Sequence, residues 1–288
     1  MTNKIAIIAC SNSCLDYFDH NYDIPIFRST LHLGEEDFLD YIDISAETFY
    51  QRLEDDKTVF PSSSYMPLGQ MIEIYEERVA KGYDQAIVIS ISKEMSGIYN
   101  AAKMAANEVD GLDVTVFDSK TLAYPQAKMA LTAAAMAEEG ASKDEILKAL
   151  EHIRDNNTVY FAVNTLTYLV KNGRLSNASG FIGNTLKIKP LLTISKEGKV
   201  ETLEKIRTFH KAVNRMMERF FEDIEGLDVE PFVIHANNPE VRDDILARLQ
   251  EYDPTFSNVF TMPLTAVVGA HAGPKTIGIG YYIKNKVL

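Results

Sequence analysis

The stretch Gln85-Ala-Ile-Val-Ile-Ser-Ile-Ser92 is the part of the sequence that decides the fold. Its run of β-branched residues is typical of a strand that is buried on both faces, as strands are in a parallel sheet covered by helices. Two further apolar strands, Lys4–Ala9 and Asp113–Asp118, are separated from it by helical patterns. This alternation predicts a mainly parallel α/β sheet, with ligands bound beyond the carboxyl ends of its strands.

The helices around these strands are predicted from apolar side chains that recur at steps of three and four residues. They are expected at Ala46–Glu54, at Leu68–Lys81, up to about Asn107, and at Ala127–Glu139. A further helix should begin at Ser142, which is followed three residues later by a glutamate in the pattern of a capping box.

The pattern changes near residue 158, where strands follow one another in runs. A hairpin is expected to turn at Glu197-Gly198, because glycine favours tight turns. The strands and the helix expected in this half are Val159–Val163, Lys187–Ile194, Lys199–Thr208, Lys211–Phe221, Val229–His235, Val259–Pro263 and Thr276–Ile283. Such runs predict an α+β domain with a largely antiparallel sheet. We therefore expect two domains, residues 1–157 and residues 158–288.

The composition excludes several classes of function. The 288 residues carry 41 acidic and 29 basic side chains, a net charge of −12, so a nucleic-acid partner is not expected. The two cysteines, Cys10 and Cys14, do not have the spacing of a redox or zinc site and are expected to be small apolar side chains near a strand end. No secretory signal and no membrane-spanning run is evident, which predicts a cytoplasmic protein.

Three serines, Ser62-Ser63-Ser64, stand shortly before an expected helix. One interpretation is a helix cap and turn, since serine beside proline is common there. The other is an anion-binding site, because hydroxyl groups and free backbone N–H groups converge at such a place.

Three more positions are candidates for anion binding. Ser96-Gly97 opens a helix after the buried strand and is either a cap or a site for a carboxylate or phosphate. Arg174 follows the Asn172-Gly173 turn and could make a two-pronged contact with an anion. His271 precedes Gly273-Pro274, which should hold its backbone in place. The segment around Ser96 is not a Gly-x-Ser-x-Gly nucleophile elbow, because Glu94 and Met95 occupy positions that this motif reserves for other residues.

Together these segments are similar to the DegV family over essentially the whole chain. The segment Met95–Ala102 resembles the family's Leu-Ser-Gly-Thr-Tyr motif. The most specific resemblance runs from Thr167 to Ser176 and continues through Gly183 to Pro190, and Ala270–Pro274 is similar as well. Three further segments that resemble the family are Lys4–Ile8, Asp43–Ser45 and Val116–Ser119.

The resemblance implies a two-domain DegV unit spanning about residues 3–286, with a fatty acid in a buried apolar tunnel between the domains. Hydroxyl groups would hold the carboxylate, and the corresponding residues here are Ser63, Ser64 and Ser96, with Ser62 as the alternative donor to Ser63. Support of the head group, or of phosphoryl transfer to it, is implied for Gly97, Arg174 and His271.

The resemblance also implies what the protein does. It would be a bacterial, cytoplasmic lipid-binding carrier without enzymatic activity, cofactor or metal, holding a long-chain fatty acid such as palmitate, stearate or oleate. Its expected partner is the catalytic subunit of a fatty acid kinase, which would convert the acid to an acyl phosphate for phospholipid synthesis. Transient contact with the membrane is a further expectation.

The sequence departs from the family at several positions. Tyr65-Met66-Pro67 replaces Gln-Pro-Ser after the serines, and Ser63 stands where the family has threonine. Tyr124-Pro125 and Lys275 occupy positions where glycine is usual, and Cys10 and Cys14 replace acidic residues.

Two alternatives to the fatty-acid carrier remain at this point. Ser96 and His271 have the residue types of a hydrolase pair that acts on acyl esters. The protein could equally carry another amphiphilic acid, such as an isoprenoid or a retinoid.

Overall fold

The computed structural model describes residues 4–178 and 188–284, and these form two compact units. Of these residues, the first unit contains 4–30, 63–155 and 196–198, and the second contains 31–62, 156–178, 188–195 and 199–284. The segment 31–62 therefore clusters with the second half of the chain. The division into residues 1–157 and 158–288 stays a prediction. Three positions used in the sequence comparison, Gly183, Leu186 and Lys187, lie outside the described residues.

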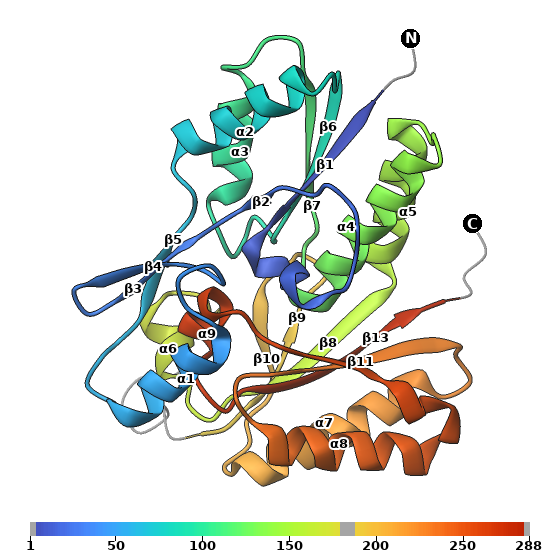
Figure 1. The fold of residues 1–288 in the computed structure, drawn as a ribbon. Helices are drawn as coiled ribbons and strands as arrows, with labels where there is room; N and C mark the ends of the chain where they lie inside the picture. Colours follow the sequence, from blue (N-terminus) through green and yellow to red (C-terminus); the bar gives the residue numbers. More distant parts are fainter. Residues whose placement is uncertain (1–3, 179–187, 285–288) are drawn as a thin grey trace. The chain divides into compact units, whose positions relative to one another are not determined.

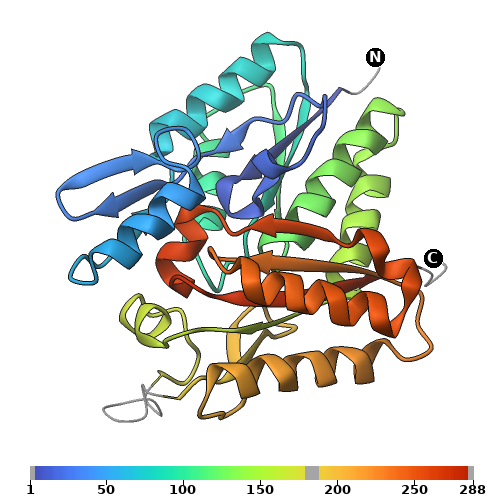
Figure 2. The same ribbon diagram turned by 60° about the horizontal axis from the view of Figure 1, so that its bottom comes forward.

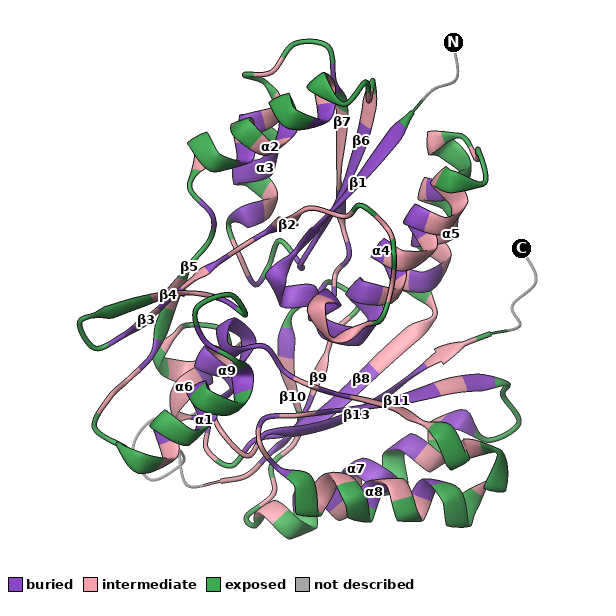
Figure 3. Cartoon of the chain, in the orientation of Figure 1, coloured by how far each residue is buried: buried purple, intermediate pink, exposed green. Residues whose placement is uncertain are grey.

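The first unit is built on a parallel sheet (Figure 1). Within the described residues its strands run in the order β2-β1-β6-β7, and each neighbouring pair is parallel. Their bounds are β1 Ile5–Cys10, β2 Ile26–Phe27, β6 Gln85–Ser90 and β7 Asp113–Asp118. All of β1 and nearly all of β6 are buried, as Figure 3 shows, which confirms the strand expected at Gln85.

Helices cover both faces of this sheet, α2 and α3 on one side and α4 and α5 on the other (Figure 1). Their bounds are α2 Leu68–Ala80, α3 Ile98–Ala106, α4 Ala123–Glu138 and α5 Lys143–Asp155. The expected capping box is confirmed, since the Ser142 N–H donates to the Glu145 carboxylate and the Glu145 N–H donates to the Ser142 hydroxyl. Helix α4 begins at Ala123, before the expected start at Ala127. Pro125 is tolerated there, because N–H groups in the first turn of a helix have no carbonyl partner within the helix.

The second unit contains a largely antiparallel sheet in the order β10-β9-β8-β13-β11-β12. Only the pair β11 and β12 is parallel among the described pairings. The bounds are β8 Asn157–Ala162, β9 Leu191–Ile194, β10 Val200–Glu204, β11 Val229–His235, β12 Phe260–Pro263 and β13 Ile277–Ile283. The expected combination of a parallel and a largely antiparallel sheet is confirmed.

Strand β10 ends at Glu204 and not at Thr208 as expected, because Thr208 already belongs to the start of the next helix. That residue is the N-cap of α7 (Phe209–Ile224), and its hydroxyl accepts a hydrogen bond from the Lys211 N–H. The hairpin turn at Glu197-Gly198 is confirmed, with Gly198 at a φ of +86° and the Ser195 N–H bonded to the Lys199 carbonyl oxygen.

Two long helices cover one face of this second sheet (Figure 2). Helix α7 packs on β8, β9 and β13, and α8 (Pro239–Tyr252) packs on β11. The core of the unit includes Met216 and Phe220 of α7, both fully buried. Helix α8 was not expected from the sequence, because only Ile245 and Leu249 of its side chains are fully buried and its apolar pattern is weak.

The remaining elements are short. Helix α1 (Ala46–Asp55) and helix α6 (Thr167–Lys171) both pack on α9 (Ala266–Ala272). A third sheet has the order β4-β3-β5, with β3 at Thr30–Leu33, β4 at Glu36–Leu39 and β5 at Ser62–Ser64. Short 3-10 helices within the described residues include η1 Ser11–Ser13, η2 Leu15–Tyr17 and η5 Pro254–Asn258. The sequence pattern did not indicate β2 to β5.

Candidate functional site

The three serines at positions 62–64 form the short strand β5 and do not cap a helix. The following helix, α2, has Pro67 as its N-cap and receives no side-chain capping bond. The interpretation of the serines as a helix cap is therefore wrong. Ser63 is half-buried, whereas Ser62 and Ser64 on either side of it are exposed. This alternation is that of an extended chain, whose successive side chains point to opposite faces.

Ser96 and Gly97 form the turn between the end of the buried strand region and α3. The Ser96 N–H donates to the Ser92 carbonyl oxygen at 3.3 Å, and the Ser96 hydroxyl oxygen accepts from the Ile98 N–H at 3.3 Å. Helix α3 begins at Ile98 with Gly97 as its N-cap. Because the Ser96 oxygen acts as an acceptor, its hydroxyl hydrogen is suited to donate to an anion.

The ring of Tyr65 brings these two segments together within the first unit. A Cβ atom built on Gly97 would lie 3.0 Å from Cε1 of Tyr65 and 3.6 Å from its Cζ. Tyr65 is two residues from Ser63, and Gly97 is the neighbour of Ser96. The structure thus places Tyr65, the residue directly after the serines, against the turn that carries Ser96. Sequence reasoning noted Tyr65 only as a departure from the family and did not identify this contact.

Other hydroxyl groups near the carboxyl ends of the parallel strands have structural roles. The buried Ser92 hydroxyl donates to the Gly198 carbonyl oxygen at 2.7 Å. The Ser119 hydroxyl donates to the Thr121 carbonyl oxygen at 3.1 Å, and the Asp118 carboxylate accepts from the Lys120 N–H at 3.1 Å. These bonds hold the loops in place, so we do not assign the groups to ligand binding.

Arg174 follows a tight turn at the end of α6, as expected. Asn172 is the C-cap, Gly173 has a φ of +66°, and the Arg174 N–H donates to the Leu169 carbonyl oxygen at 2.8 Å. A φ in this left-handed range favours glycine. The Arg174 guanidinium is exposed, and its Nη1 donates to the Asn172 carbonyl oxygen.

His271 lies in the last turn of α9, which is tied to the same turn. Nδ2 of Asn172 donates to the Ala270 carbonyl oxygen at 3.0 Å. Burial, and to a smaller extent the positive charge of Arg174, lower the pKa of the His271 imidazole to about 4. The imidazole is therefore neutral near pH 7. The second unit thus brings Arg174 and His271 into one corner.

Aromatic side chains pack beside this corner, and sequence reasoning missed them. Tyr168 of α6 stacks on Phe60, with ring centroids 5.4 Å apart and the planes at 15°. A Cβ atom on Gly273 would lie 2.5 Å from Cδ2 of Tyr168, so Gly273 is needed for space as well as for its φ of +83°. The ammonium of Lys171 lies 4.7 Å from the Phe60 ring centroid. The chain before the serines is therefore held against α6.

A further polar cluster at the end of β11, formed by His235, Asn237 and Asn238, includes two asparagines with structural roles. Asn237 donates from Nδ2 to Glu54 at 3.2 Å, and Asn238 donates to the Lys275 carbonyl oxygen at 2.9 Å. Lys275 has a φ of +61°, which accounts for the glycine that is usual there in the family. Burial, with a smaller effect of Arg242, lowers the pKa of His235 to about 4.

The hydrolase alternative is disfavoured by the charge next to His271. A histidine that acts as a general base is normally oriented by a carboxylate, which stabilises the imidazolium as it forms. The charged group that acts on His271 is the Arg174 guanidinium, which opposes protonation of the imidazole.

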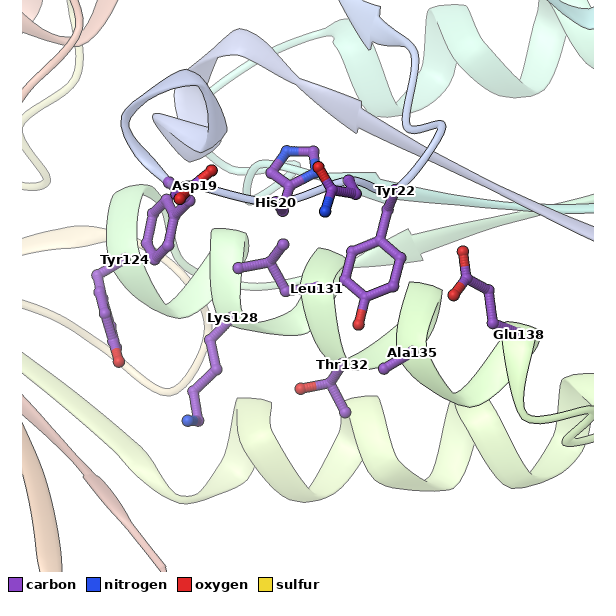
Figure 4. Close-up of a pocket in the computed structure, with 11 residues that line it drawn as sticks. Asp19, His20, Tyr22, Tyr124, Lys128, Leu131, Thr132, Ala135 and Glu138 are labelled. Atoms are coloured by element: carbon purple, nitrogen blue, oxygen red, sulfur yellow. The ribbon is translucent and has the colours of Figure 1, made fainter.

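A pocket of about 640 Å³ lies elsewhere in the first unit, between residues 18–22 and α4 (Figure 4). Its lining includes Phe18, Tyr124 and Lys128, and the rings of Phe18 and Tyr124 have centroids 5.8 Å apart. No predicted site residue lines this pocket. The departure from the family at Tyr124 therefore places an aromatic ring in a pocket distinct from the serine strand.

Two features of the described residues bear on other classes of function. Within residues 4–178 and 188–284, no group of three or more histidine, cysteine, aspartate or glutamate side chains is arranged to hold a metal ion. Over the same part of the chain, every helix is too short or too polar to span a bilayer. Cys10 and Cys14 are both buried and form no disulfide within the described residues, in agreement with the small apolar role expected for them.

Comparisons with known proteins agree with the fold. A family model described as "Uncharacterised protein, DegV family" matches residues 4–284. Protein DegV of Bacillus subtilis is 36% identical over 254 residues, covering 87% of this chain and 88% of the relative. The crystal structure of DegV, a fatty acid binding protein from B. subtilis, matches with a TM-score of 0.83 at 32% identity, covering 98% and 99% of the two chains. A DegV family protein from Thermus thermophilus, described for its fatty acid binding, matches with a TM-score of 0.81 at 26% identity, covering 98% and 100%.

Proposed function

Because this chain belongs to the DegV family, we propose that it binds a long-chain fatty acid, such as palmitate, stearate or oleate, and holds the carboxylate with serine hydroxyls. The similar proteins of B. subtilis and T. thermophilus are described as fatty acid binding. The observation that carries the proposal is the contact of Tyr65 with Gly97, which supports a shared role for the hydroxyl groups on the two segments.

The acyl chain and the carboxylate make different demands on such a protein. Each buried CH₂ group contributes about 0.8 kcal/mol to binding, so an apolar enclosure binds the chain. A carboxylate removed from water must receive hydrogen bonds, because an unpaired buried charge is strongly unfavourable. Ser63 and Ser96 carry the donors that we assign to it, and the role of the exposed Ser64, which the family resemblance also implies, stays a prediction. Ser63 is preferred to Ser62, since Ser63 is the half-buried member of β5.

Arg174 and His271 are proposed to support the head group. The exposed guanidinium adds a positive charge, and the neutral imidazole can donate or accept a hydrogen bond without adding a charge of its own. Gly97 leaves room beside Ser96. The apolar tunnel implied by the family resemblance stays a prediction.

The proposed biological role is that of a cytoplasmic carrier. It would present its fatty acid, after transient contact with a membrane, to the catalytic subunit of a fatty acid kinase, which would transfer a phosphoryl group from ATP to the carboxylate. The resulting acyl phosphate would enter phospholipid synthesis. Formation of acyl phosphate that requires this protein, the kinase subunit and Mg-ATP together would support this role, and formation without this protein would contradict it.

Ligand identification tests the binding proposal directly. Organic extraction of the purified protein, followed by mass spectrometry, should yield a long-chain fatty acid. A different amphiphilic acid in the extract would correct the ligand class. A protein that carries no acid and does not bind added palmitate or oleate would contradict the proposal.

Substitutions test the residues. Ser96→Ala should weaken oleate binding by about 1–3 kcal/mol, which is about 5- to 150-fold, because a hydrogen bond to a charged group is lost. Ser63→Ala should have a similar effect and Ser62→Ala little. Ser142→Ala is the matched control, because this serine caps α5 and is expected to change stability but not affinity. Unchanged affinity in Ser96→Ala would remove this residue from the site.

A further inference from the structure

We infer that Tyr65 is a positioning residue, whose ring holds the Ser63-Ser64 segment against the Ser96–Gly97 turn. The inference rests on the proposed function, since it concerns the serines assigned to the carboxylate. It assigns a role to a residue at which this chain departs from its family.

The contact is a direct one between the ring and a glycine backbone. The Cβ position of Gly97 lies 3.0 Å from Cε1, 3.6 Å from Cζ and 3.7 Å from the hydroxyl oxygen of Tyr65. The nearest of these distances is tighter than nearly all real Cβ contacts, so the ring would have to move by a few tenths of an ångström to admit a side chain. The ring therefore restricts the space at position 97.

The backbone at position 97 does not itself require glycine. Gly97 has a φ of −72° and a ψ of −7°, a right-handed conformation that any L-residue adopts. Gly273 is different, since its φ is +83°. The restriction on a side chain at position 97 thus comes from the ring of Tyr65, and the two residues form one packing unit.

The position of Tyr65 in the chain connects this packing to the serines. Tyr65 follows directly after β5, and Met66 next to it is buried. A ring packed on Gly97 therefore holds the carboxyl end of the Ser63-Ser64 segment beside the turn that carries Ser96.

Tyr65 contributes little to the core of the unit. Its exposure is 46%, whereas Met66 beside it is 6% exposed and anchors the segment. Because truncation of a half-exposed ring leaves no buried cavity, its loss should affect the position of the serines more than the stability of the fold.

A double-mutant cycle with oleate as the probe tests the inference. Tyr65→Ala and Gly97→Ala should each weaken oleate binding by about tenfold, equivalent to about 1.4 kcal/mol. The double variant should bind no more weakly than Tyr65→Ala, because the new methyl group meets no ring. Tyr65→Phe should restore binding to within about twofold, since it keeps the ring. Tyr252→Ala, which removes an equally exposed ring (47%) in the second unit, is the control and should not change binding.

Two outcomes would overturn the inference. One is oleate binding by Tyr65→Ala that equals that of the unmodified protein. The other is strictly additive losses in the double variant, which would show that the two positions act independently.

A second measurement separates this inference from the proposed function, because it needs no ligand. The sequence contains no tryptophan, so Tyr65→Trp creates a single fluorescent reporter on Gly97. Adding Gly97→Ala should shift its emission to longer wavelength and increase quenching by iodide. If the protein bound no fatty acid, this shift would still support the packing unit. If the shift were absent, the packing unit would be refuted whether or not oleate binds.

Discussion

The titration of His271 provides the most direct test of the electrostatics at the α6 and α9 corner. An unperturbed histidine has a pKa of about 6.5. Burial, and to a smaller extent Arg174, lower the pKa of His271 to about 4 in the folded protein. Between these two values the unfolded chain binds more protons than the folded one, so the free energy of unfolding should fall as the pH decreases from about 6.5 towards about 4.

The size of this effect follows from the two pKa values. One such group changes the free energy of unfolding by at most about 1.4 kcal/mol per pH unit. At about pH 5, His271 should therefore lower the free energy of unfolding by about 1–2 kcal/mol relative to pH 7. The lower end of this range allows for solvent screening of the partly exposed imidazole. His271→Gln, which does not titrate, should lose this part of the pH dependence. His235→Gln is the matched variant, since the pKa of His235 is also lowered to about 4, mainly by burial.

Two assays check the prediction. Urea denaturation at about pH 7 and about pH 5 gives the change in unfolding free energy for the unmodified protein and each variant, and the titration of the carboxylates cancels in the difference. NMR of histidine ring carbons, assigned with the His271→Gln variant, gives the pKa directly. Arg174→Gln should raise the pKa of His271. A pKa near 6.5 in the folded protein, or an unchanged pH dependence in His271→Gln, would refute the reasoning.

Three predictions concern stability and are measured by chemical denaturation. Gly269→Ala should destabilise the protein by about 2 kcal/mol or more, because the new Cβ would lie 2.2 Å from the hydroxyl oxygen of the buried Tyr50. In contrast, Gly69→Ala in α2 should stabilise the protein by about 0.5–1 kcal/mol, since a Cβ at this position meets no atom within 4 Å. Phe220→Ala should cost about 3–5 kcal/mol, because the ring is fully buried in the second core, and a loss below about 1 kcal/mol would contradict that packing. Ser45→Ala should cost about 1 kcal/mol through the lost cap of α1, and an unchanged stability would show that the cap contributes nothing.

The sequence by itself determined the two kinds of sheet and most of the long helices. The β-branched segment at Gln85–Ser92 has a composition that suits only a buried strand, and the apolar spacing of Lys211–Phe221 suits only a helix with one buried face. Such patterns are local, so they can be recognised without the rest of the chain. Helix α8 could not be recognised, because too few of its residues are buried to produce a pattern.

The sequence also indicated which polar residues to consider, since Ser96, Arg174 and His271 stand near the ends of helices and Ser63 lies in a run of three serines. Only the tertiary structure decided which neighbours they have. The contact of Tyr65 with Gly97 joins positions 32 residues apart in the sequence (97 − 65). The effect of Arg174 on His271 joins positions 97 residues apart (271 − 174). No local pattern specifies such contacts, because they depend on how the packed elements bring distant segments together. For the same reason, the pKa of His271 could be obtained only from the burial and charge that folding produces.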